Sequence, residues 1–291
     1  MAYEAWIKTV LRPYLCRKKM NKQWVTFPDI DPVAVHLGPL EIRWYALAYL
    51  AGIIIAMMLM NREARKSDTP FAVDDIARLT NNCVLGIIIG GRLGFVLFYN
   101  AEYYLSAPLE IFKVWNGGMS FHGGLLGVIA ATILTVRKTK IPVFAISDLL
   151  ACVAPIGLFF GRIANFINGE LFGRITEHPI GMVFPNGGPL PRHPSQLYEA
   201  FLEGFLIFIT INGLRFLKPN LPAGLLTGLF FILYGTGRIL AEFTREPDAH
   251  IGFITTIANT QITTGQALSA PILLTGVFLI YLSLKHKTNS K

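Results

Sequence analysis

Long apolar stretches separated by short polar connections dominate the 291 residues of this chain. A helix that spans a bilayer needs about 20 mostly apolar residues. The first and last stretches are the most uniformly apolar, whereas the fourth and fifth carry polar residues that favour a tilted or broken helix. The pattern predicts an all-α polytopic membrane protein, a bundle of about seven transmembrane helices with loops and small elements on the outer face. The predicted spans are Trp44–Met60, Leu79–Tyr99, Met119–Val136, Phe144–Ile167, Leu197–Leu214, Ala223–Phe243 and Gln266–Leu284.

The composition supports a membrane protein and excludes other classes. Apolar residues make up 53% of the chain and charged residues only 15%, where a soluble domain usually carries about 25% charged residues. The mean hydropathy is +0.49, so a soluble enzyme and a disordered chain are both excluded. The net charge of +8 does not indicate a nucleic-acid partner, because cytoplasmic loops of membrane proteins are rich in Lys and Arg. Three widely spaced cysteines, Cys16, Cys83 and Cys152, form no disulfide framework and no metal-binding pair.

Lysine and arginine counting predicts the orientation. One set of loops, together with the C-terminal end, holds twelve of these residues, and the opposite set holds six when counted from Met20. The C-terminus is therefore expected in the cytoplasm and the N-terminus outside. The first nineteen residues add five more to the outer side. Either Met1–Lys19 is a mis-assigned start or weakly ordered tail, or it is a genuine extension of a protein whose later helices fix the topology. We expect one membrane domain over residues 20–291.

Three arginines, Arg92, Arg162 and Arg238, fall inside predicted spans, and each follows a glycine. An arginine at mid-depth costs at least about 2.5–3.5 kcal/mol on insertion scales, so each needs a partner. One explanation is an internal ion pair, and another is a shared anionic ligand. Guanidinium binds phosphate through two parallel hydrogen bonds, and phospholipid is the abundant phosphate ligand in a bilayer. These facts do not separate an enzyme from a lipid transporter. The candidate acidic partners are Asp148, Glu199, Glu203 and Glu242.

Two polar segments interrupt the apolar pattern. Over Gly161–Gly173 a hydrophobic helix gives way to Asn, Gly and Glu, which suggests that these groups line a cavity. In Gly118–Gly124, two Gly-Gly pairs flank Ser120 and His122 and leave the imidazole accessible. A histidine at a helix start can be a structural cap, but the surrounding glycines favour a site.

With these segments, the chain resembles the bacterial prolipoprotein diacylglyceryl transferase family. The family signature, Gly-Arg, any residue, a small residue, Asn-Phe, an apolar residue, Asn, any residue, Glu, two of any type and Gly, matches Gly161–Gly173 without departure. Gly118–Gly124 resembles the family's His-Gly-Gly stretch, and His193–Glu199 resembles its His-Pro-Ser-Gln-Leu-Tyr-Glu stretch. The late Tyr-Gly, Arg, Glu-Phe, Arg, Pro-Asp pattern is similar to Tyr234 to Asp248. Further matches are Phe27–Pro32 and Trp44-Tyr45.

The resemblance implies an activity, partners and a location. The family transfers the sn-1,2-diacylglyceryl group of phosphatidylglycerol to the lipobox cysteine thiol of a preprolipoprotein, as the first step of lipoprotein maturation. The products are a thioether and glycerol-1-phosphate. The implied partners are phosphatidylglycerol, the signal-peptide segment of the preprolipoprotein and membrane lipid, with no cofactor and no metal. The implied location is the bacterial inner membrane, with a periplasmic N-terminus and small periplasmic elements. Because the nucleophile belongs to the substrate, we expect Cys83 and Cys152 to be packing residues.

The resemblance also suggests which residues act. Arg162 and Arg238 are expected to hold the phosphate as the leaving group develops charge. Arg92 is assigned a packing or secondary role. His122 is the candidate base for the thiol, since its pKa lies near the operating pH. Alternatively, His122 positions the lipid, and Arg238 or solvent takes the proton.

The remaining matched residues are expected to contact substrate. Tyr45 could donate to the lipid headgroup or anchor the helix in the membrane. Asn165 and Asn168 could bind glycerol hydroxyls or satisfy a broken helix. Glu170 could orient an arginine or bind a hydroxyl, and Gly173 is expected to permit a turn.

Three late residues complete the candidate site. Tyr234 is assigned to substrate binding. Glu242 lies four residues after Arg238, so the two share a helix face and can pair. Arg245 is a headgroup or loop partner. The competing function is a non-enzymatic lipid transporter or scramblase that uses the arginines as a headgroup path. The chain shows no inverted repeat of the kind common in transporters, which favours the enzyme.

Overall fold

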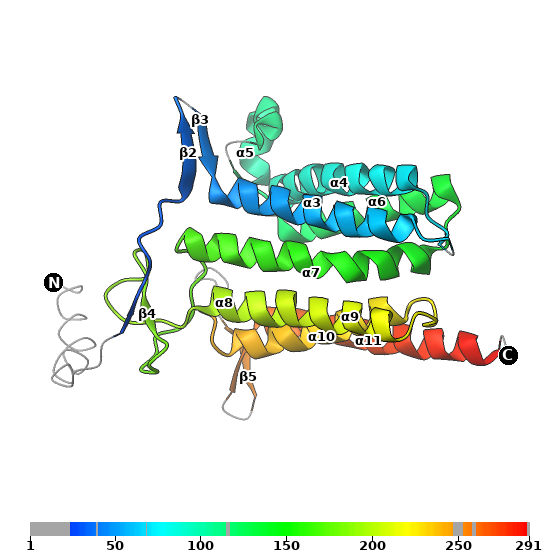
Figure 1. Ribbon diagram of the computed structural model, residues 1–291. Coiled ribbons are helices and arrows are strands. Elements are labelled where there is room, and N and C mark those ends of the chain that lie inside the picture. Colours follow the sequence, from blue (N-terminus) through cyan, green and yellow to red (C-terminus); the bar gives the residue numbers. More distant parts are fainter. Residues whose placement is uncertain are drawn as a thin grey trace.

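The structure is a computed structural model that describes residues 24–38, 40–67, 69–114, 117–246, 253–257 and 260–289. The predicted extension Met1–Lys19, the alternative start Met20, and Pro247 and Asp248 of the late motif lie outside these ranges. The long helices run side by side and form a bundle, with three small β-hairpins or strand pairs at one end and the C-terminus at the other (Figure 1). We call these the β end and the C-terminal end. The long helices are α3 (Trp44–Ala64), α4 (Val73–Tyr99), α6 (Phe121–Thr139), α7 (Val143–Ile167), α10 (Leu225–Glu242) and α11 (Thr264–Asn289).

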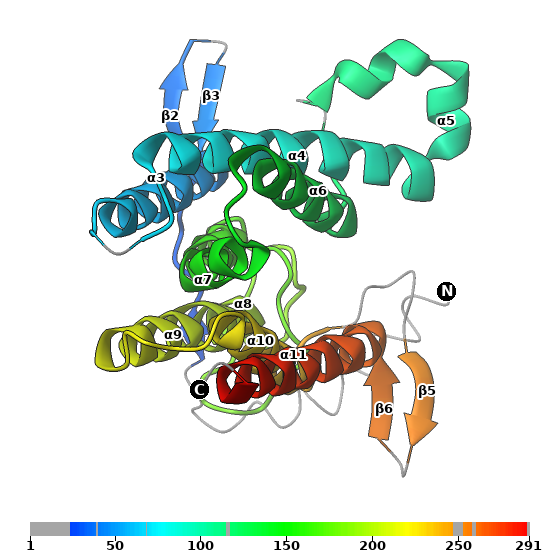
Figure 2. The ribbon, with the colours of Figure 1, turned by 90° about the vertical axis from the view of Figure 1, so that its right-hand side faces the viewer.

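Shorter elements complete the fold. A further long helical segment consists of α8 (Ser195–Glu199), the π-helical turn η5 (Ala200–Phe205) and α9 (Leu206–Leu217). An arm made of α5 (Ala101–Ser106) and the 3₁₀ turn η3 (Pro108–Phe112) projects from the bundle (Figure 2). The strands are β1 (Val25–Thr26) parallel to β4 (Met182–Val183), β2 (Val33–Leu37) antiparallel to β3 (Leu40–Arg43), and β5 (Phe253–Ile257) antiparallel to β6 (Thr260–Thr263).

The all-α membrane fold is confirmed, with a finer result on the number of spans. Among the described residues, six helices are long and apolar enough to cross a membrane. The predicted span Met119–Val136 does form a helix, α6, but α6 is not one of the six, so the count of seven stays a prediction. Neither predicted break is present: the fifth span is one continuous helix over Ser195–Leu217 that contains the π-helical turn η5. Helix α7 continues through Pro155 and ends at Ile167.

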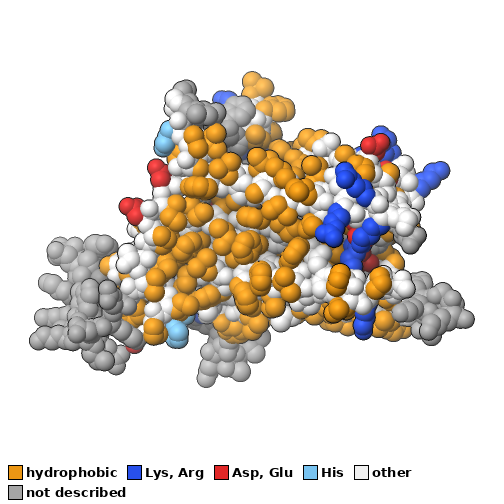
Figure 3. Space-filling model, in the orientation of Figure 1, with side chains coloured by type: hydrophobic (Ala, Val, Ile, Leu, Met, Phe, Trp, Pro, Cys, Tyr) orange, Lys and Arg blue, Asp and Glu red, His pale blue; other side chains and the backbone are white. Residues whose placement is uncertain are grey.

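The surface agrees with a membrane environment. Hydrophobic side chains form a broad band over the face shown in Figure 3, and Lys and Arg gather at the C-terminal end. Large apolar side chains of the long helices are unusually exposed, with Leu97 at 65%, Leu126 at 62% and Leu274 at 71%. A water-soluble monomer rarely exposes contiguous apolar area of this size. Lipid is therefore the natural solvent for the band.

Helix α7 lies between two groups of helices (Figure 2). It contacts α3 and α6 on one side and η5, α9 and α10 on the other. The buried core near the C-terminal end includes Cys152, and Cys83 packs against this core, so both thiols serve packing.

Glycines hold α4 and α6 together. Gly86, Gly90 and Gly94 of α4 face Gly123 and Gly127 of α6, and a Cβ on Gly127 would overlap the carbonyl oxygen of Gly86. Small residues at such spacing allow membrane helices to approach closely. One of the glycines next to His122 is therefore needed for helix packing, so its presence is not evidence of a catalytic site.

Candidate functional site

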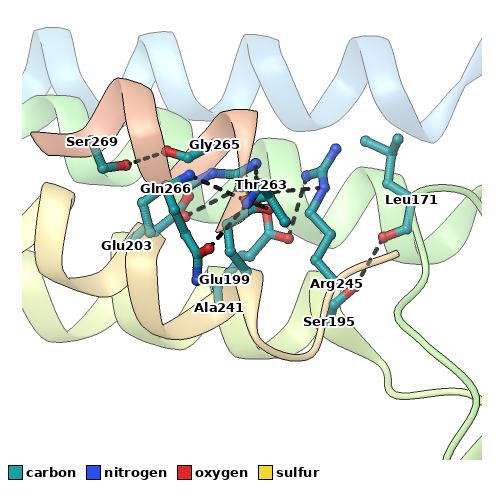
Figure 4. Close-up of polar contacts among 12 residues, drawn as sticks. Leu171, Ser195, Glu199, Glu203, Ala241, Arg245, Thr263, Gly265, Gln266 and Ser269 are labelled. Carbon is teal, nitrogen blue, oxygen red and sulfur yellow. Dashed lines mark hydrogen bonds and ion pairs between the residues drawn. The ribbon is translucent and has the colours of Figure 1, made fainter. Parts of the chain in front are cut away.

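Six charged side chains meet inside the bundle near the β end. Glu199, Glu203 and Arg245 point toward one polar centre that also includes Thr263 (Figure 4). The side chains come from α7, α8, η5, α10 and the segment that follows α10, so no two consecutive elements could build the centre alone. We call this set the Arg–Glu cluster. Its members are Arg162, Glu199, Glu203, Arg238, Glu242 and Arg245.

Glu199 is the hub of the Arg–Glu cluster. Its Oε2 lies 2.8 Å from Arg162 Nε and 3.1 Å from Arg238 Nη1, and its Oε1 lies 3.4 Å from Arg245 Nη1. The Glu199 side chain is only 1% exposed. Burying a carboxylate is very costly unless it is paired and hydrogen-bonded. Three guanidinium partners satisfy that requirement.

Glu203 joins the same two arginines one helical turn later. Its Oε2 lies 3.2 Å from Arg162 Nη2, and its Oε1 lies 3.6 Å from Arg238 Nη1. The side chain has no exposed surface. Glu203 Oε1 has no hydrogen-bond partner among the described residues. Glu203 is thus the less completely satisfied of these two carboxylates.

Glu242 closes the Arg–Glu cluster on the side of α11. The Arg238 Nη2 atom lies 2.5 Å from Glu242 Oε1, so the predicted pairing on one face of α10 is present. The Thr263 hydroxyl donates to Glu242 Oε2 at 2.7 Å. Gly265 leaves room for the carboxylate, because a Cβ at that position would overlap it.

Two explanations were offered for the arginines inside predicted spans, an internal ion pair and a shared anionic ligand. The structure tests the first of them. Arg162 and Arg238 do form internal ion pairs, so the ion-pair explanation is correct for both. Asp148 is not a partner of Arg162 or Arg238: its carboxylate accepts from Gly224 N at 2.7 Å and from the amide and hydroxyl of Thr227.

The guanidinium groups are not fully enclosed. The side chains of Arg162, Arg238 and Arg245 are 18%, 15% and 11% exposed. Arg162 Nη1 has no hydrogen bond or ion pair within the described part of the chain, although Nε and Nη2 are both bonded to carboxylates. A guanidinium has five donor hydrogens. The Arg–Glu cluster therefore retains capacity to bind an anionic ligand in addition to its own carboxylates.

The end of α7 explains the roles of the two asparagines. Asn168 caps the helix, and Gly169 follows with a positive φ of 63°, the left-handed conformation that commonly ends a helix. The Asn165 and Asn168 side-chain amides donate to Glu170 Oε1 at 2.8 and 3.2 Å. In this structure the asparagines thus bond the helix end, as one of the two alternatives predicted. Gln196 Nε2 donates to the Glu170 carbonyl and ties this turn to α8.

Gly173 lies where three backbone segments meet. Its N–H donates to the His193 carbonyl at 2.8 Å, and its neighbour Arg174 donates to the Thr244 carbonyl at 2.8 Å. A Cβ on Gly173 would overlap Thr244 and His193. Gly173 is not among the glycines with positive φ. The expected turn is therefore wrong, and the glycine is required for close backbone approach beside Arg245.

The tyrosines lie at the margin of the Arg–Glu cluster. The Tyr45 hydroxyl lies 3.3 Å from that of Tyr49, within electrostatic range of Arg162 and Glu170. Tyr234 is half-buried, and the charges of Arg162, Arg238, Glu199 and Glu203 act on its hydroxyl.

His122 and Arg92 lie on the other side of α7. His122 is exposed at the start of α6, in the α4–α6 pair that Figure 2 shows opposite α10. Arg92 is 4% exposed and donates to backbone carbonyls of the arm and of the loop that follows it. This pattern gives Arg92 a packing role, away from the Arg–Glu cluster. The acceptors are Glu110, Ile111, Lys113, Gly117 and Gly118.

His193 is held just outside the membrane span that begins at Ser195. Its Nδ1 lies 3.2 Å from the Tyr198 hydroxyl. Burial, and then the charge of His178, lower the pKa of His193 from 6.5. The imidazole is therefore neutral near pH 7 and suited to hydrogen bonding rather than to binding an anion.

Sequence reasoning treated Glu199 and Glu203 only as possible partners of the arginines and did not include them among the site residues. The structure places both at the centre of the Arg–Glu cluster. One signal was present: two glutamates four residues apart in an apolar segment share a helix face and need partners inside a membrane.

Comparisons with known proteins show the family to which the chain is similar. A family model described as prolipoprotein diacylglyceryl transferase matches residues 32–282. The chain is 49% identical over 261 residues to the phosphatidylglycerol–prolipoprotein diacylglyceryl transferase of Photobacterium profundum, covering 90% of this chain and 96% of that protein. It is 52% identical over 264 residues to the protein of that name from Rhodospirillum rubrum, covering 90% and 95%. The Vibrio cholerae protein of that name is 47% identical over 266 residues, covering 91% and 96%.

Proposed function

The chain belongs to the prolipoprotein diacylglyceryl transferase family, and from this premise we propose how its residues carry out the reaction. The protein is a transferase of lipoprotein maturation. It transfers the sn-1,2-diacylglyceryl group from phosphatidylglycerol to the lipobox cysteine thiol of a preprolipoprotein. The observation that carries the proposed mechanism is the placement of Arg162, Arg238 and Arg245 around one buried centre.

The arginines bind the phosphate and stabilise its departure. The thiolate attacks the glyceryl carbon, a carbon–sulfur bond forms, and the bond from that carbon to the phosphate oxygen breaks. Negative charge therefore grows on the leaving phosphate, which is the point at which fixed cationic donors stabilise the transition state most. Arg162 is well placed for this role because Glu199 and Glu203 orient two of its nitrogens and leave the third available.

A base is needed because a free thiol is mostly protonated at neutral pH. His122 takes the thiol proton in this proposal. Its exposure at the start of α6 gives a guest peptide access to the imidazole.

The remaining residues bind or support the substrates. Tyr45 and Tyr234 donate hydrogen bonds to the lipid headgroup. Asn165, Asn168 and Glu170 form a polar rim for the glycerol hydroxyls. Gly173 keeps Arg245 close to the headgroup, and Glu242 holds Arg238 in place.

The proposed location is the bacterial cytoplasmic membrane. The C-terminal end, rich in Lys and Arg (Figure 3), faces the cytoplasm in this proposal. The β end and the Arg–Glu cluster then lie toward the periplasm, where preprolipoproteins present their lipobox.

The direct test uses purified protein, phosphatidylglycerol and a lipobox peptide. The expected result is a mass increase on the peptide cysteine equal to one diacylglyceryl group, together with glycerol-1-phosphate. Arg162→Ala should reduce the rate by about 10²–10³-fold, as for loss of a donor to a developing anion. Movement of lipid without modification of the cysteine would instead support the transporter.

A further inference from the structure

The net charge of the Arg–Glu cluster bears on the free energy of phosphate binding. The cluster holds three arginines and three glutamates, so its formal charge is already balanced. Phosphatidylglycerol brings a further negative charge into the same buried space. An uncompensated charge in a medium of low polarity is very costly. Binding is therefore favoured if one carboxylate loses its charge at the same time.

Building on the proposed function, we propose that Glu203 is a positioning residue that takes up one proton when the lipid phosphate binds to Arg162 and Arg238. The proton comes from water and converts the Glu203 carboxylate to a carboxylic acid. It returns to water when glycerol-1-phosphate leaves and the two arginines pair with Glu203 again. Glu203 lies outside the sequence motifs that identified the family.

The contacts single out Glu203 from the other two carboxylates. Glu199 contacts three guanidinium groups, at 2.8, 3.1 and 3.4 Å. Glu242 has Arg238 at 2.5 Å and the Thr263 hydroxyl at 2.7 Å. Glu203 has one contact of 3.2 Å and one of 3.6 Å, and its Oε1 accepts no hydrogen bond among the described residues. The carboxylate with the weakest stabilisation of its charged form is the least costly to protonate.

The same two arginines link Glu203 to the ligand. Arg162 and Arg238 are the cations that contact Glu203, and both side chains are partly exposed. A phosphate that attracts these guanidinium groups weakens their hold on Glu203. Among the described residues, Glu199 adds a like charge close to Glu203, and Tyr234 is a further titratable group on which the Glu203 charge acts.

The backbone keeps Glu203 from moving away. Glu203 lies in the π-helical turn η5, a type of turn that is often found at functional sites. The next residue, Gly204, packs so closely against α7 that a Cβ would lie 2.6 Å from Phe159 Cβ. The Glu203 side chain has no exposed surface. Loss of charge, rather than withdrawal, is therefore the available response to a bound phosphate.

The experiment measures proton uptake by isothermal titration calorimetry. Short-chain phosphatidylglycerol is titrated into purified protein in detergent, in buffers of different ionisation enthalpy at one pH. Wild type should take up about one proton per lipid, and its Kd should rise with pH by up to about tenfold per pH unit over the range of uptake. Glu203→Gln should bind the lipid with no uptake from this position and a Kd that hardly depends on pH. Glu203→Asp should retain uptake with a shifted pH range.

Glu63→Gln is the matched control. Glu63 is also a glutamate of a membrane helix paired with an arginine, Arg215 at 2.6 Å, but it lies outside the Arg–Glu cluster. It should keep wild-type uptake. Binding by wild type without uptake, or equal uptake in Glu203→Gln, would overturn the role of Glu203 and leave the proposed transferase intact. If Glu203→Gln does not fold, Glu203→Asp serves as the test. Proton uptake by Glu203→Asp over the same pH range as wild type would also overturn the role of Glu203. Absence of phosphatidylglycerol binding in wild type would instead contradict the proposed phosphate site.

Discussion

At the scale of single residues, the buried arginines of this protein differ in the groups to which their guanidinium nitrogens donate. Arg92 uses its donors on backbone carbonyls and joins an arm to α4. Arg162 donates to two carboxylates of another helical segment, and its Nη1 has no partner among the described residues. The planar guanidinium suits both tasks, because it presents several donors in one rigid fork.

Arg162→Lys tests the need for that fork. A single ammonium group cannot hold Glu199 and Glu203 in their present positions and also present a donor to phosphate. We expect kcat/KM for transfer to the lipobox peptide to fall by about 10²-fold or more. Arg137→Lys, an exposed position at the end of α6, is the control and should retain activity. Near-normal activity of Arg162→Lys would show that charge alone is sufficient.

His122→Gln tests the base. If His122 takes the thiol proton, the rate should fall by about 10²–10⁴-fold, and the dependence of the rate on pH should change. The pH–rate profile of purified enzyme is the measurement. His36→Gln, an exposed histidine of β2, should leave the profile unchanged. An unaltered rate and profile in His122→Gln would exclude His122 as the base.

His193 should make stability depend on pH. Its pKa is lower in the folded protein than its ordinary value of 6.5, chiefly through burial. The unfolded chain therefore binds the proton more readily, so this contribution to stability is present above about pH 6.5 and is lost as the pH falls below it. We expect the unfolding temperature of wild type in detergent to decrease from about pH 7.5 to about pH 5 by more than that of His193→Gln. Equal decreases would contradict this assignment.

At the scale of elements, glycines and a π turn determine how closely the helices approach. The α4–α6 contact depends on Gly86, Gly90, Gly123 and Gly127, whose carbonyls and Cα atoms occupy the space of a side chain. The η5 turn places Gly204 against α7 in the same manner. Because lipid tails are as apolar as the helices, such close packing supplies much of the association free energy in a membrane.

Gly127→Ala should weaken the α4–α6 pair. The new methyl group would overlap the backbone of Gly86, and overpacking of this kind costs about 1–3 kcal/mol. Thermal unfolding in detergent should show a lower midpoint. Gly157→Ala in α7 is the control, because a Cβ there would meet nothing within 4 Å. Similar effects of the two substitutions would show that loss of glycine, rather than overlap, is responsible.

At the scale of the whole molecule, charge is distributed unevenly along the bundle axis. Lys and Arg gather at the C-terminal end, and the middle is covered by apolar side chains (Figure 3). The Arg–Glu cluster lies toward the β end (Figures 1 and 4). This asymmetry separates a cytoplasmic anchor from a site that faces the opposite side of the membrane.

Cysteine labelling in intact cells tests the orientation. Single cysteines are introduced at Lys218, at the C-terminal end, and at Asp31, at the β end, after replacement of the three native cysteines. A membrane-impermeant maleimide should label Asp31→Cys and should not label Lys218→Cys until the membrane is permeabilised. Both positions are exposed in the structure. The reverse pattern of labelling would invert the proposed topology.

The sequence alone was sufficient for the membrane fold, the approximate positions of its helices and the family. Apolar length and the cost of burying arginine are local properties, so they can be recognised along the chain without knowing which segments meet. For the same reason Arg92, Arg162 and Arg238 could be recognised as residues that need partners inside the membrane.

Only the tertiary structure showed which acidic residues pair with the buried arginines. Arg162, Glu203 and Arg238 are far apart in the chain and meet only because α7, η5 and α10 pack together. Nothing local distinguished Asp148, which accepts from backbone and hydroxyl donors, from Glu199, which joins three arginines. Pairing of buried charges depends on distances and directions between distant segments, and these follow from helix packing rather than from spacing along the chain.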